Sequence, residues 1–391
     1  VYTWQNTGAM LQRFEELWGP YPYAGIKYGN AVFQGAVAME HATLSSIGDT
    51  PFTLSSREST LYPGPAGELV NAHEVAHQWF GNAVRVARWG DIWLNEGFAR
   101  YAEVIWLEEF YGPAFARDYL DILRENRDLW TGTLRDPAPN QLFSLVTYNK
   151  GALVLHMLRQ VMGRDGLFTA MRDYVSDPGL RHAEAVTIED FRAHCEAVHG
   201  EDLGWFFGPW FDRDTIPSVD VDWASDAGSL SLRLSQDPGD VYELPLPVRV
   251  HRADGSSRDF TVRVDEAVED VTLAVGGRVT SVEIDPERDW VVESTLRVRQ
   301  PLTYLGARPN PFNPGTEITF EVGSATDVEI EIFDVRGRRV RAWTLENVPP
   351  GRDTVLWGGE DDGGSAVASG VYHVRIQGAG RTETGKLTLV R

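Results

Sequence analysis

Residues 71–103, NAHEVAHQWFGNAVRVARWGDIWLNEGFARYAE, decide how the rest of the chain is interpreted. If their beginning is helical, His73 and His77 lie four positions apart on one face, so that both imidazoles can bind one ion. Glu74 lies between them, where a carboxylate can take a proton from an activated water. Glu96 follows 19 positions after His77, near the start of a second apolar-rich helical run. Two histidines and one glutamate are the open ligand set of a catalytic zinc rather than the Cys-rich set of a structural zinc.

Chance is the first alternative, because HExxH has only three fixed letters and short motifs match by accident. A solvent-exposed helix could carry the same letters without binding a metal. The residues around the pair, Val75, Ala76, Trp79 and Phe80, are apolar and indicate a half-buried face instead. Uncompensated His and Glu side chains would be costly on such a face, which favours a metal site.

The same stretch resembles the zinc-binding core of the aminopeptidase N family of gluzincin metallopeptidases, in which HExxH is followed after eighteen residues by Glu in a WLNEGFA-type segment. The resemblance implies a thermolysin-like, mainly helical catalytic domain. It also implies one Zn2+ per chain, held by His73, His77 and Glu96, with Glu74 as the general base. Metzincins, another class of zinc peptidase, are excluded because they need Gly at the third position beyond HExxH, where this chain has Phe80.

A strand is predicted over residues 30–40, NAVFQGAVAME. With the residue that follows, its end reads VAMEH, which resembles the GAMEN exopeptidase motif of the same family but differs in the first and last letters. The resemblance implies that Glu40 binds the free amino terminus of the substrate, while the backbone of Ala38 and Met39 bonds the peptide. The alternative is an ordinary surface glutamate at the end of a strand.

Two further residues complete the predicted site. TYNKGA, at residues 147–152, resembles the YxKG element of the family and implies that Tyr148 stabilises the oxyanion of the tetrahedral intermediate. Its alternative is a tyrosine that packs on the core at the start of a helix. Glu103 follows Glu96 by seven residues on the same helix face, where it is a candidate for orienting a ligand histidine or else a plain surface residue.

The remaining histidines and the single cysteine carry no predicted chemistry. His156, His182, His194 and His199 show no ligand spacing with one another. Because Cys195 is the only cysteine of the sequence, no disulfide can form within the chain. We expect its side chain to be buried like that of a small apolar residue. Helices are predicted at residues 9–18, 113–130, from about 146, at 166–175 and at 187–200.

From Ile216 the hydrophobic pattern changes from period 3.6 to period 2, which is typical of strands. The sequence therefore predicts a multidomain α+β protein: a catalytic domain at 1–215, an antiparallel β-sandwich at 216–296 and a second one at 297–391, after a linker LRVRQP. The last domain opens with NPFNPGTEITF and resembles the immunoglobulin-like domain of flagellar hook-capping proteins and type IX secretion sorting domains. That resemblance implies contact with a secretion or cell-surface machinery.

Composition limits the partners. The 391 residues carry a net charge of -21, which disfavours nucleic acid and anionic membranes because both need a basic surface. No apolar run approaches the length of a membrane span, and Val1 begins no signal peptide. We expect a fragment or processed form that lacks the amino-terminal β-domain of the family. We also expect a secreted, cell-surface or periplasmic bacterial protein.

The function predicted from the sequence is a zinc-dependent aminopeptidase that removes the amino-terminal residue of peptides. Two alternatives stay open. The chain could be a zinc endopeptidase or another zinc hydrolase, because the metal ligands alone do not distinguish these, or a non-catalytic surface module carried by its β-domains. Glu40 is the residue that distinguishes an aminopeptidase from the first alternative, since an endopeptidase does not bind a free amino terminus of its substrate.

Overall fold

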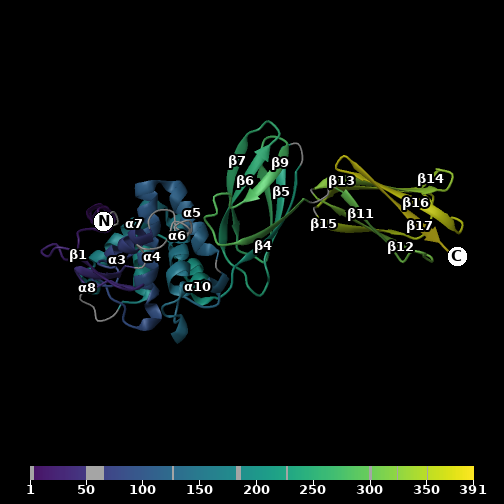
Figure 1. Cartoon of the computed structure of the whole chain (residues 1–391). Coiled ribbons are helices and arrows are strands. Elements are labelled where there is room, and N and C mark those ends of the chain that lie inside the picture. The colour runs from purple at the N-terminus through teal and green to yellow at the C-terminus, as the bar shows by residue number, and fades with distance from the viewer. Residues whose placement is uncertain are drawn as a thin grey trace. The chain divides into compact units, whose positions relative to one another are not determined.

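The computed structural model describes residues 4–49, 66–125, 127–181, 186–225, 228–298, 302–323, 325–349 and 351–391. The chain divides into two compact units (Figure 1). The first holds Val1–Ile216 with Arg288–Val291, and the second holds Pro217–Glu287 with Val292–Arg391. In the described part of the chain, no helix combines the length and the apolar composition that crossing a membrane requires.

Helices dominate the first unit (Figure 1). They are α1 (Thr7–Trp18), α3 (Ala66–Ala76), α4 (Trp93–Tyr111), α5 (Pro113–Arg124), α6 (Gly151–Met162), α7 (Arg164–Ser176), α8 (Pro178–Arg181), α9 (Ile188–His199) and α10 (Gly204–Asp212). The helices predicted at 9–18, 166–175 and 187–200 are confirmed as α1, α7 and α9. At α9, the backbone N–H of Thr187 donates to the Asp190 carboxylate at 2.8 Å, which caps the start of the helix.

Helix α4 is buried along nearly all of its length from Trp93 to Leu107, because α3, α5 and α6 cover it, and the polar side chains of Asn95, Glu96 and Glu103 are buried together with its apolar ones. Two glycines let α4 and α6 approach closely: a Cβ on Gly97 would lie 3.1 Å from the Cα of Gly151. This close approach brings the start of α6 beside the start of α4. Residues from both helix starts therefore meet in one place.

The turn before α6 differs from the predicted continuous helix that begins at about Val146. Val146–Lys150 form one π-helical turn, and the α-helix begins only at Gly151. The buried Lys150 amine anchors this turn by donating to the carbonyls of Gly132 at 2.9 Å and Arg213 at 2.7 Å. Burial lowers the pKa of Lys150 to about 7.

A small sheet lies in the same unit, and it corrects the prediction of one strand over residues 30–40. The structure has two strands there, β1 (Gly29–Phe33) and β2 (Ala38–Met39), which flank β3 (Leu44–Gly48) in the order β1-β3-β2. Strand β1 is parallel to β3 and β2 is antiparallel to it. The chain reverses between β1 and β2, where the backbone N–H of Gly35 donates to the Asp49 carboxylate at 3.0 Å. A period-2 pattern does not show such a reversal.

The described residues of the second unit form four sheets, and strands dominate this unit (Figure 1). Two have the orders β10-β4-β5-β8 and β7-β6-β9, and the other two have the orders β11-β12-β15 and β14-β13-β16-β17. The strands are β4 (Ser218–Ser225), β5 (Ser229–Ser235), β6 (Leu244–Arg252), β7 (Ser257–Val264), β8 (Val268–Ala274), β9 (Val279–Ile284), β10 (Glu293–Val298), β11 (Leu302–Arg308), β12 (Thr316–Val322), β13 (Thr326–Asp334), β14 (Arg339–Val348), β15 (Gly351–Trp357), β16 (Gly370–Gly378) and β17 (Arg381–Leu389).

These sheets confirm a multidomain α+β protein, while the thermolysin-like arrangement, the two sandwiches and the boundaries at 215/216 and 296/297 stay predictions. Two details differ from the sequence analysis. Strand β10 contains the first three residues of the predicted linker, and it pairs with β4 in parallel rather than antiparallel register. Strands β11 to β17 share a hydrophobic core made of residues between Leu302 and Leu389, such as Phe320 and Trp357.

The side chains without predicted chemistry have ordinary structural surroundings. Cys195 is fully buried, as expected. His156 contacts Asp289 at 3.0 Å, and His194 Nδ1 donates to the Asp190 carbonyl at 2.8 Å. His182 lies outside the described residues.

Candidate active site

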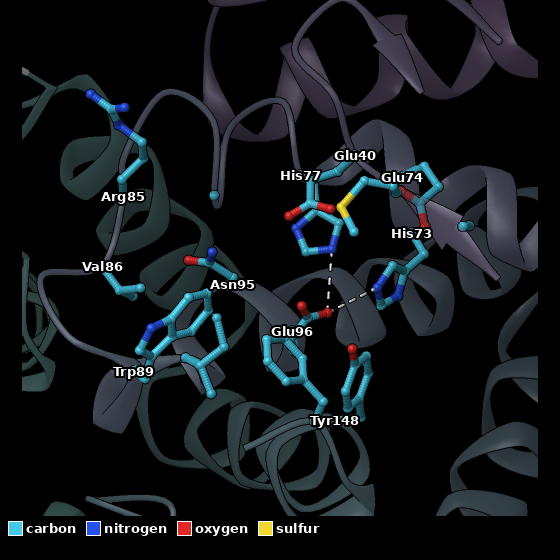
Figure 2. Close-up of a pocket in the computed structure, with 15 residues that line it drawn as sticks. Glu40, His73, Glu74, His77, Arg85, Val86, Trp89, Asn95, Glu96 and Tyr148 are labelled. Atoms are coloured by element: carbon cyan, nitrogen blue, oxygen red, sulfur yellow. Dashed lines mark hydrogen bonds and ion pairs between the residues drawn. The ribbon is translucent and has the colours of Figure 1, made fainter. Parts of the chain in front are cut away.

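The predicted metal ligands meet at the ends of α3 and α4. His77 directly follows α3, and its backbone N–H still donates to the carbonyl of His73 at 3.2 Å, so the two imidazoles keep the spacing of one helical turn. Their Nε2 atoms lie 3.3 Å (His73) and 3.4 Å (His77) from the same Oε2 atom of Glu96 (Figure 2). One ligand atom from each of the three residues lies within 4.8 Å of the others, so this cluster could hold a metal ion.

The other ring nitrogen of each histidine is held by an acceptor. His77 Nδ1 lies 2.9 Å from the carbonyl oxygen of Phe80, which can only accept, so Nδ1 must carry the proton. His73 Nδ1 lies 2.8 Å from Oε1 of Glu103 and donates to it in the same way. In the neutral imidazoles the lone pair is then on Nε2, which faces Glu96. This is the tautomer that a metal ligand needs.

Glu103 is itself fixed by two donors. It accepts a hydrogen bond from Arg100 at 3.0 Å and another from the hydroxyl of Tyr119. The side chains that contact one another here come from α3 (His73), α4 (Arg100 and Glu103) and α5 (Tyr119). Glu103 is 2 % exposed. The structure therefore places Glu103 against His73, the arrangement in which a carboxylate orients a ligand.

The charges of the cluster are complementary. Burial lowers the pKa of His77, but the carboxylates of Glu96, Glu40 and Glu74 outweigh burial and raise this pKa to about 10. Burial raises the pKa of Glu96, but His77 and His73 outweigh it and lower this pKa overall. The site thus attracts positive charge strongly, as a cation site requires.

Glu74 points into the same cavity from α3 (Figure 2). It is 5 % exposed, and its Oε2 atom has no hydrogen-bond partner among the described residues. Burial raises the pKa of Glu74, which brings this carboxylate closer to the range in which it can exchange protons near neutral pH. A buried carboxylate oxygen that is left unpaired in the folded chain is free to act on a bound molecule.

Tyr148 reaches the cluster from the π-helical turn. Its ring stacks on that of His73 with centroids 5.9 Å apart, and the guanidinium of Arg100 lies 5.6 Å from the Tyr148 centroid. Burial and the nearby Glu96 raise the pKa of Tyr148 far above its ordinary value. The phenol therefore stays protonated and can donate a hydrogen bond at neutral pH.

Glu40 approaches the cluster from the end of β2, next to Ala38 and Met39, and all three line the cavity. Two side chains that follow the HExxH motif hold this strand end: Asn82 donates to the Glu40 carbonyl at 2.5 Å, and Gln78 accepts from the backbone N–H of Thr43 at 2.9 Å. Neither Asn82 nor Gln78 is among the residues predicted from the sequence. Only their position directly after the motif could have suggested their role.

The cavity has a volume of about 360 Å³. Its described lining contains every predicted site residue except Glu103, which lies behind His73. It also contains residues that the sequence analysis missed, namely Gly81, Arg85, Val86, Trp89, Ile92, Asn95 and Phe143. Trp89 is 62 % exposed and Phe143 is 58 % exposed, and their rings contact each other edge to face at 5.6 Å. Exposed aromatic side chains at a cavity are typical of a binding surface.

Comparison with known proteins decides the family. Residues 2–210 match the family described as "Peptidase family M1 domain". The chain belongs to peptidase family M1. The predicted resemblance to the aminopeptidase N family is thereby confirmed. Residues 308–381 match the "FlgD Ig-like domain", in agreement with the predicted resemblance to hook-capping proteins.

Several aminopeptidases are similar to this family M1 chain. It is 25% identical over 270 residues to a leucyl aminopeptidase of Saccharolobus solfataricus, covering 65% of this chain and 31% of that protein. It is 27% identical over 217 residues to a membrane alanyl aminopeptidase of Heliothis virescens, covering 51% of this chain and 22% of that protein. A crystal structure of Legionella pneumophila aminopeptidase A in complex with aspartic acid matches 76% of this chain and 35% of that one, with a TM-score of 0.62 and 19% identity. The last similarity shows the fold alone. The chain thus spans about a fifth to a third of the length of the two curated relatives.

Proposed function

We propose that this family M1 chain is a zinc-dependent aminopeptidase with one Zn2+ held by His73, His77 and Glu96. The donor set supports the metal, because two imidazole nitrogens and a carboxylate form the three-ligand set of a catalytic zinc. The hydrogen bonds of both Nδ1 atoms support it as well, since they leave the Nε2 lone pairs directed at Glu96. When bound, zinc would serve as a Lewis acid that polarises the scissile carbonyl and lowers the pKa of a water molecule.

The chain's own residues supply the proton transfers and the oxyanion contact. Glu74 takes a proton from the attacking water and passes it to the leaving amine, a role that its unpaired buried oxygen and raised pKa support. Tyr148 donates a hydrogen bond to the oxyanion, which forms next to the ring that stacks on His73. Glu103 holds His73 in its ligand orientation through the 2.8 Å contact.

One observation carries the choice of an aminopeptidase over an endopeptidase. Glu40 lines the same cavity as Glu74, and Figure 2 shows it close to His77. A carboxylate in this place can pair with the ammonium group of a substrate, while the backbone of Ala38 and Met39 bonds the peptide. An internal peptide segment offers no ammonium to Glu40. Substrates with a free amino terminus are therefore favoured.

A panel of aminoacyl fluorogenic substrates tests this proposal. The chain should hydrolyse at least one of them, lose this activity to a chelator and regain it with about one equivalent of zinc per chain. Cleavage of internal bonds in amino-terminally blocked peptides, without hydrolysis of any aminoacyl substrate, would favour the endopeptidase alternative. Active protein with less than about half an equivalent of zinc would contradict the metal assignment.

For residues 297–391 we propose a second role, attachment to a secretion or cell-surface machinery outside the cell or in the periplasm. The match of residues 308–381 to the FlgD Ig-like domain supports this proposal. The separate core of strands β11 to β17 also supports it, because a part with its own core can be recognised by itself. Expression with and without these residues tests the role. The full chain should be exported or surface-bound, and export that is unchanged by the deletion would contradict it.

A further inference from the structure

Arg85 is the only arginine or lysine among the described residues that line the cavity. The other ionisable side chains of this lining are Glu40, Glu74, Glu96, His73, His77 and Tyr148. Figure 2 shows Arg85 and Val86 on one flank of the cavity, away from Glu40 and Glu74. The lining therefore has a carboxylate for an ammonium group on one side and, on the other, an arginine whose guanidinium extends outward from the predicted metal ligands (Figure 2).

The guanidinium of Arg85 is exposed, and within the described ranges it has no hydrogen-bond or ion-pair partner. Arg88, three residues further along, shows the usual behaviour of an arginine in this acidic protein: it binds Asp91 at 2.8 Å and Asp136 at 3.0 Å. With 57 acidic against 36 basic residues, carboxylates are abundant on this chain. Arg85 lies beside the active site without a carboxylate partner, so its guanidinium is available to bind the carboxylate of a substrate.

The backbone fixes where the Arg85 side chain begins. Its neighbour Val84 forms a β-bridge with Phe80, directly after the metal-binding motif, and Val86 forms one with Val186. The Arg85 carbonyl itself accepts from the N–H of Val186 at 3.4 Å. The backbone at Arg85 is therefore already fixed at the edge of the cavity. Binding a ligand there costs little free energy for ordering the backbone.

We propose that Arg85 is a specificity residue that binds a substrate carboxylate located after the cleaved bond. This inference rests on the proposed function, in which the ammonium group of the peptide binds Glu40. The rest of the peptide then extends away from Glu40. The carboxylate has two possible sources. It is either the terminal carboxylate of a di- or tripeptide or the side chain of Asp or Glu downstream of the bond. A guanidinium binds both in the same bidentate way.

Matched peptides test the proposal. We expect Ala-Ala-Ala to be cleaved with a kcat/KM about 3 to 10 times that of its carboxy-terminal amide, a modest ratio because Arg85 is exposed to solvent. Ala-Ala-Glu-amide against Ala-Ala-Gln-amide separates the side-chain source from the terminal one. The preference should fall at about 0.5 M salt, because salt screens exposed charges.

Substitution at Arg85 then tests the residue itself. Arg85→Gln should bring the acid-to-amide ratio to about 1, and Arg85→Lys should keep part of it. Arg117→Gln removes the same charge from the exposed surface of α5 outside the cavity and should leave the ratio unchanged. Equal rates for acids and amides in the wild type, or a ratio that survives Arg85→Gln, would overturn the proposal.

Binding gives a readout that does not depend on turnover. In the zinc-loaded Glu74→Gln protein, calorimetry should find that the acids bind about 3 to 10 times more tightly than the amides, and that Arg85→Gln removes this difference. Equal affinities overturn the role of Arg85. If the affinity difference is preserved but the wild type hydrolyses no peptide, the proposed aminopeptidase function is contradicted. The role of Arg85 is not contradicted by that result. A preference that instead follows an acidic first residue contradicts the downstream placement.

Discussion

The two sides of the cavity are built in opposite ways. On the side of α3 and α4, the side chains are buried and held by further residues: His77 is 2 % exposed and Glu96 is 6 % exposed. On the side of β2 and residues 81–89, the side chains that line the cavity are half-buried or exposed, such as Met39 at 51 % and Trp89 at 62 %. There the backbone rather than the side chain is fixed, as the contact of Asn82 with the Glu40 carbonyl shows.

In the proposed function, this difference separates the residues of the chemical step from the residues that recognise the substrate. Metal binding and proton transfer need atoms held within fractions of an ångström, which buried and hydrogen-bonded side chains provide. Substrate side chains vary, and exposed residues on a fixed backbone can adapt to them. We therefore expect substitutions on the buried side to change turnover or metal content by large factors. Substitutions on the exposed side should change the choice of substrate by smaller factors.

The largest effect is expected for Glu74→Gln. The amide keeps the shape of the side chain but cannot accept a proton, so kcat should fall by about 100-fold to 10,000-fold. Zinc content should stay near one equivalent, because Glu74 is not one of the proposed ligands, whereas His73→Ala should lose both zinc and activity. Zinc analysis alongside steady-state kinetics checks both. Activity within about tenfold of wild type in Glu74→Gln would contradict the general-base role.

Tyr148→Phe should be next in size. Removal of one oxyanion donor is expected to lower kcat by about 100-fold to 1000-fold while zinc content stays the same. Tyr111→Phe is the matched control, since its hydroxyl donates to Glu68 and lies outside the cavity lining. If Tyr148→Phe and Tyr111→Phe had equal kcat values, Tyr148 would be only a packing residue.

Glu103→Ala should act on the metal rather than on the reaction. Loss of the acceptor of His73 Nδ1 should weaken zinc binding by about 10-fold to 100-fold, measured by competition with a chelator. Glu109→Ala, on the same helix but paired with Arg13 and Arg164 away from His73, is the control. With saturating zinc, much of the activity of Glu103→Ala should return. Unchanged zinc affinity would show that Glu103 only fills the space behind His73.

Gly97→Ala tests the packing that brings Tyr148 to the ligands. The added methyl would meet the backbone of Gly151 and push α6 away from α4, which should cost about 1 to 3 kcal/mol of unfolding free energy. Gly208→Ala in α10 is the control, because no atom lies within 4 Å of its added methyl. Denaturant unfolding measures both. Equal stability of the two variants would mean that α4 and α6 do not need this close approach.

Much of the buried side could be predicted from the sequence, because helix geometry converts spacing directly into position. His73 and His77 share a face at four residues' separation, and the structure brings Glu96 and Glu103 to them along one further helix. The exposed side could not be predicted in this way. Arg85 and Phe143 reach the cavity through tertiary contacts that no local period reveals.

The strand predicted over residues 30–40 shows the same limit. Its alternating pattern was compatible with one strand, yet the chain reverses at Gly35 and places β2 on the other side of β3. At the reversal the Gly35 N–H donates to the Asp49 carboxylate, fourteen residues away, and both strands pair with β3, and none of these contacts is local in the sequence. Glu40 does follow the end of a strand, as predicted, but this strand is the short β2 rather than one continuous strand over residues 30–40.

The ratio of kcat/KM for a free peptide to that for its amino-terminally acetylated form, in the wild type and in Glu40→Ala, tests the central claim most directly. A charge-assisted bond to an ammonium contributes about 1.5 to 3 kcal/mol, so the wild type should prefer the free peptide strongly and Glu40→Ala should lose about 10-fold to 100-fold of kcat/KM on it. The acetylated peptide should be a poor substrate for both proteins. Equal cleavage of free and acetylated peptides by the wild type, or a ratio that Glu40→Ala leaves unchanged, would contradict the aminopeptidase function.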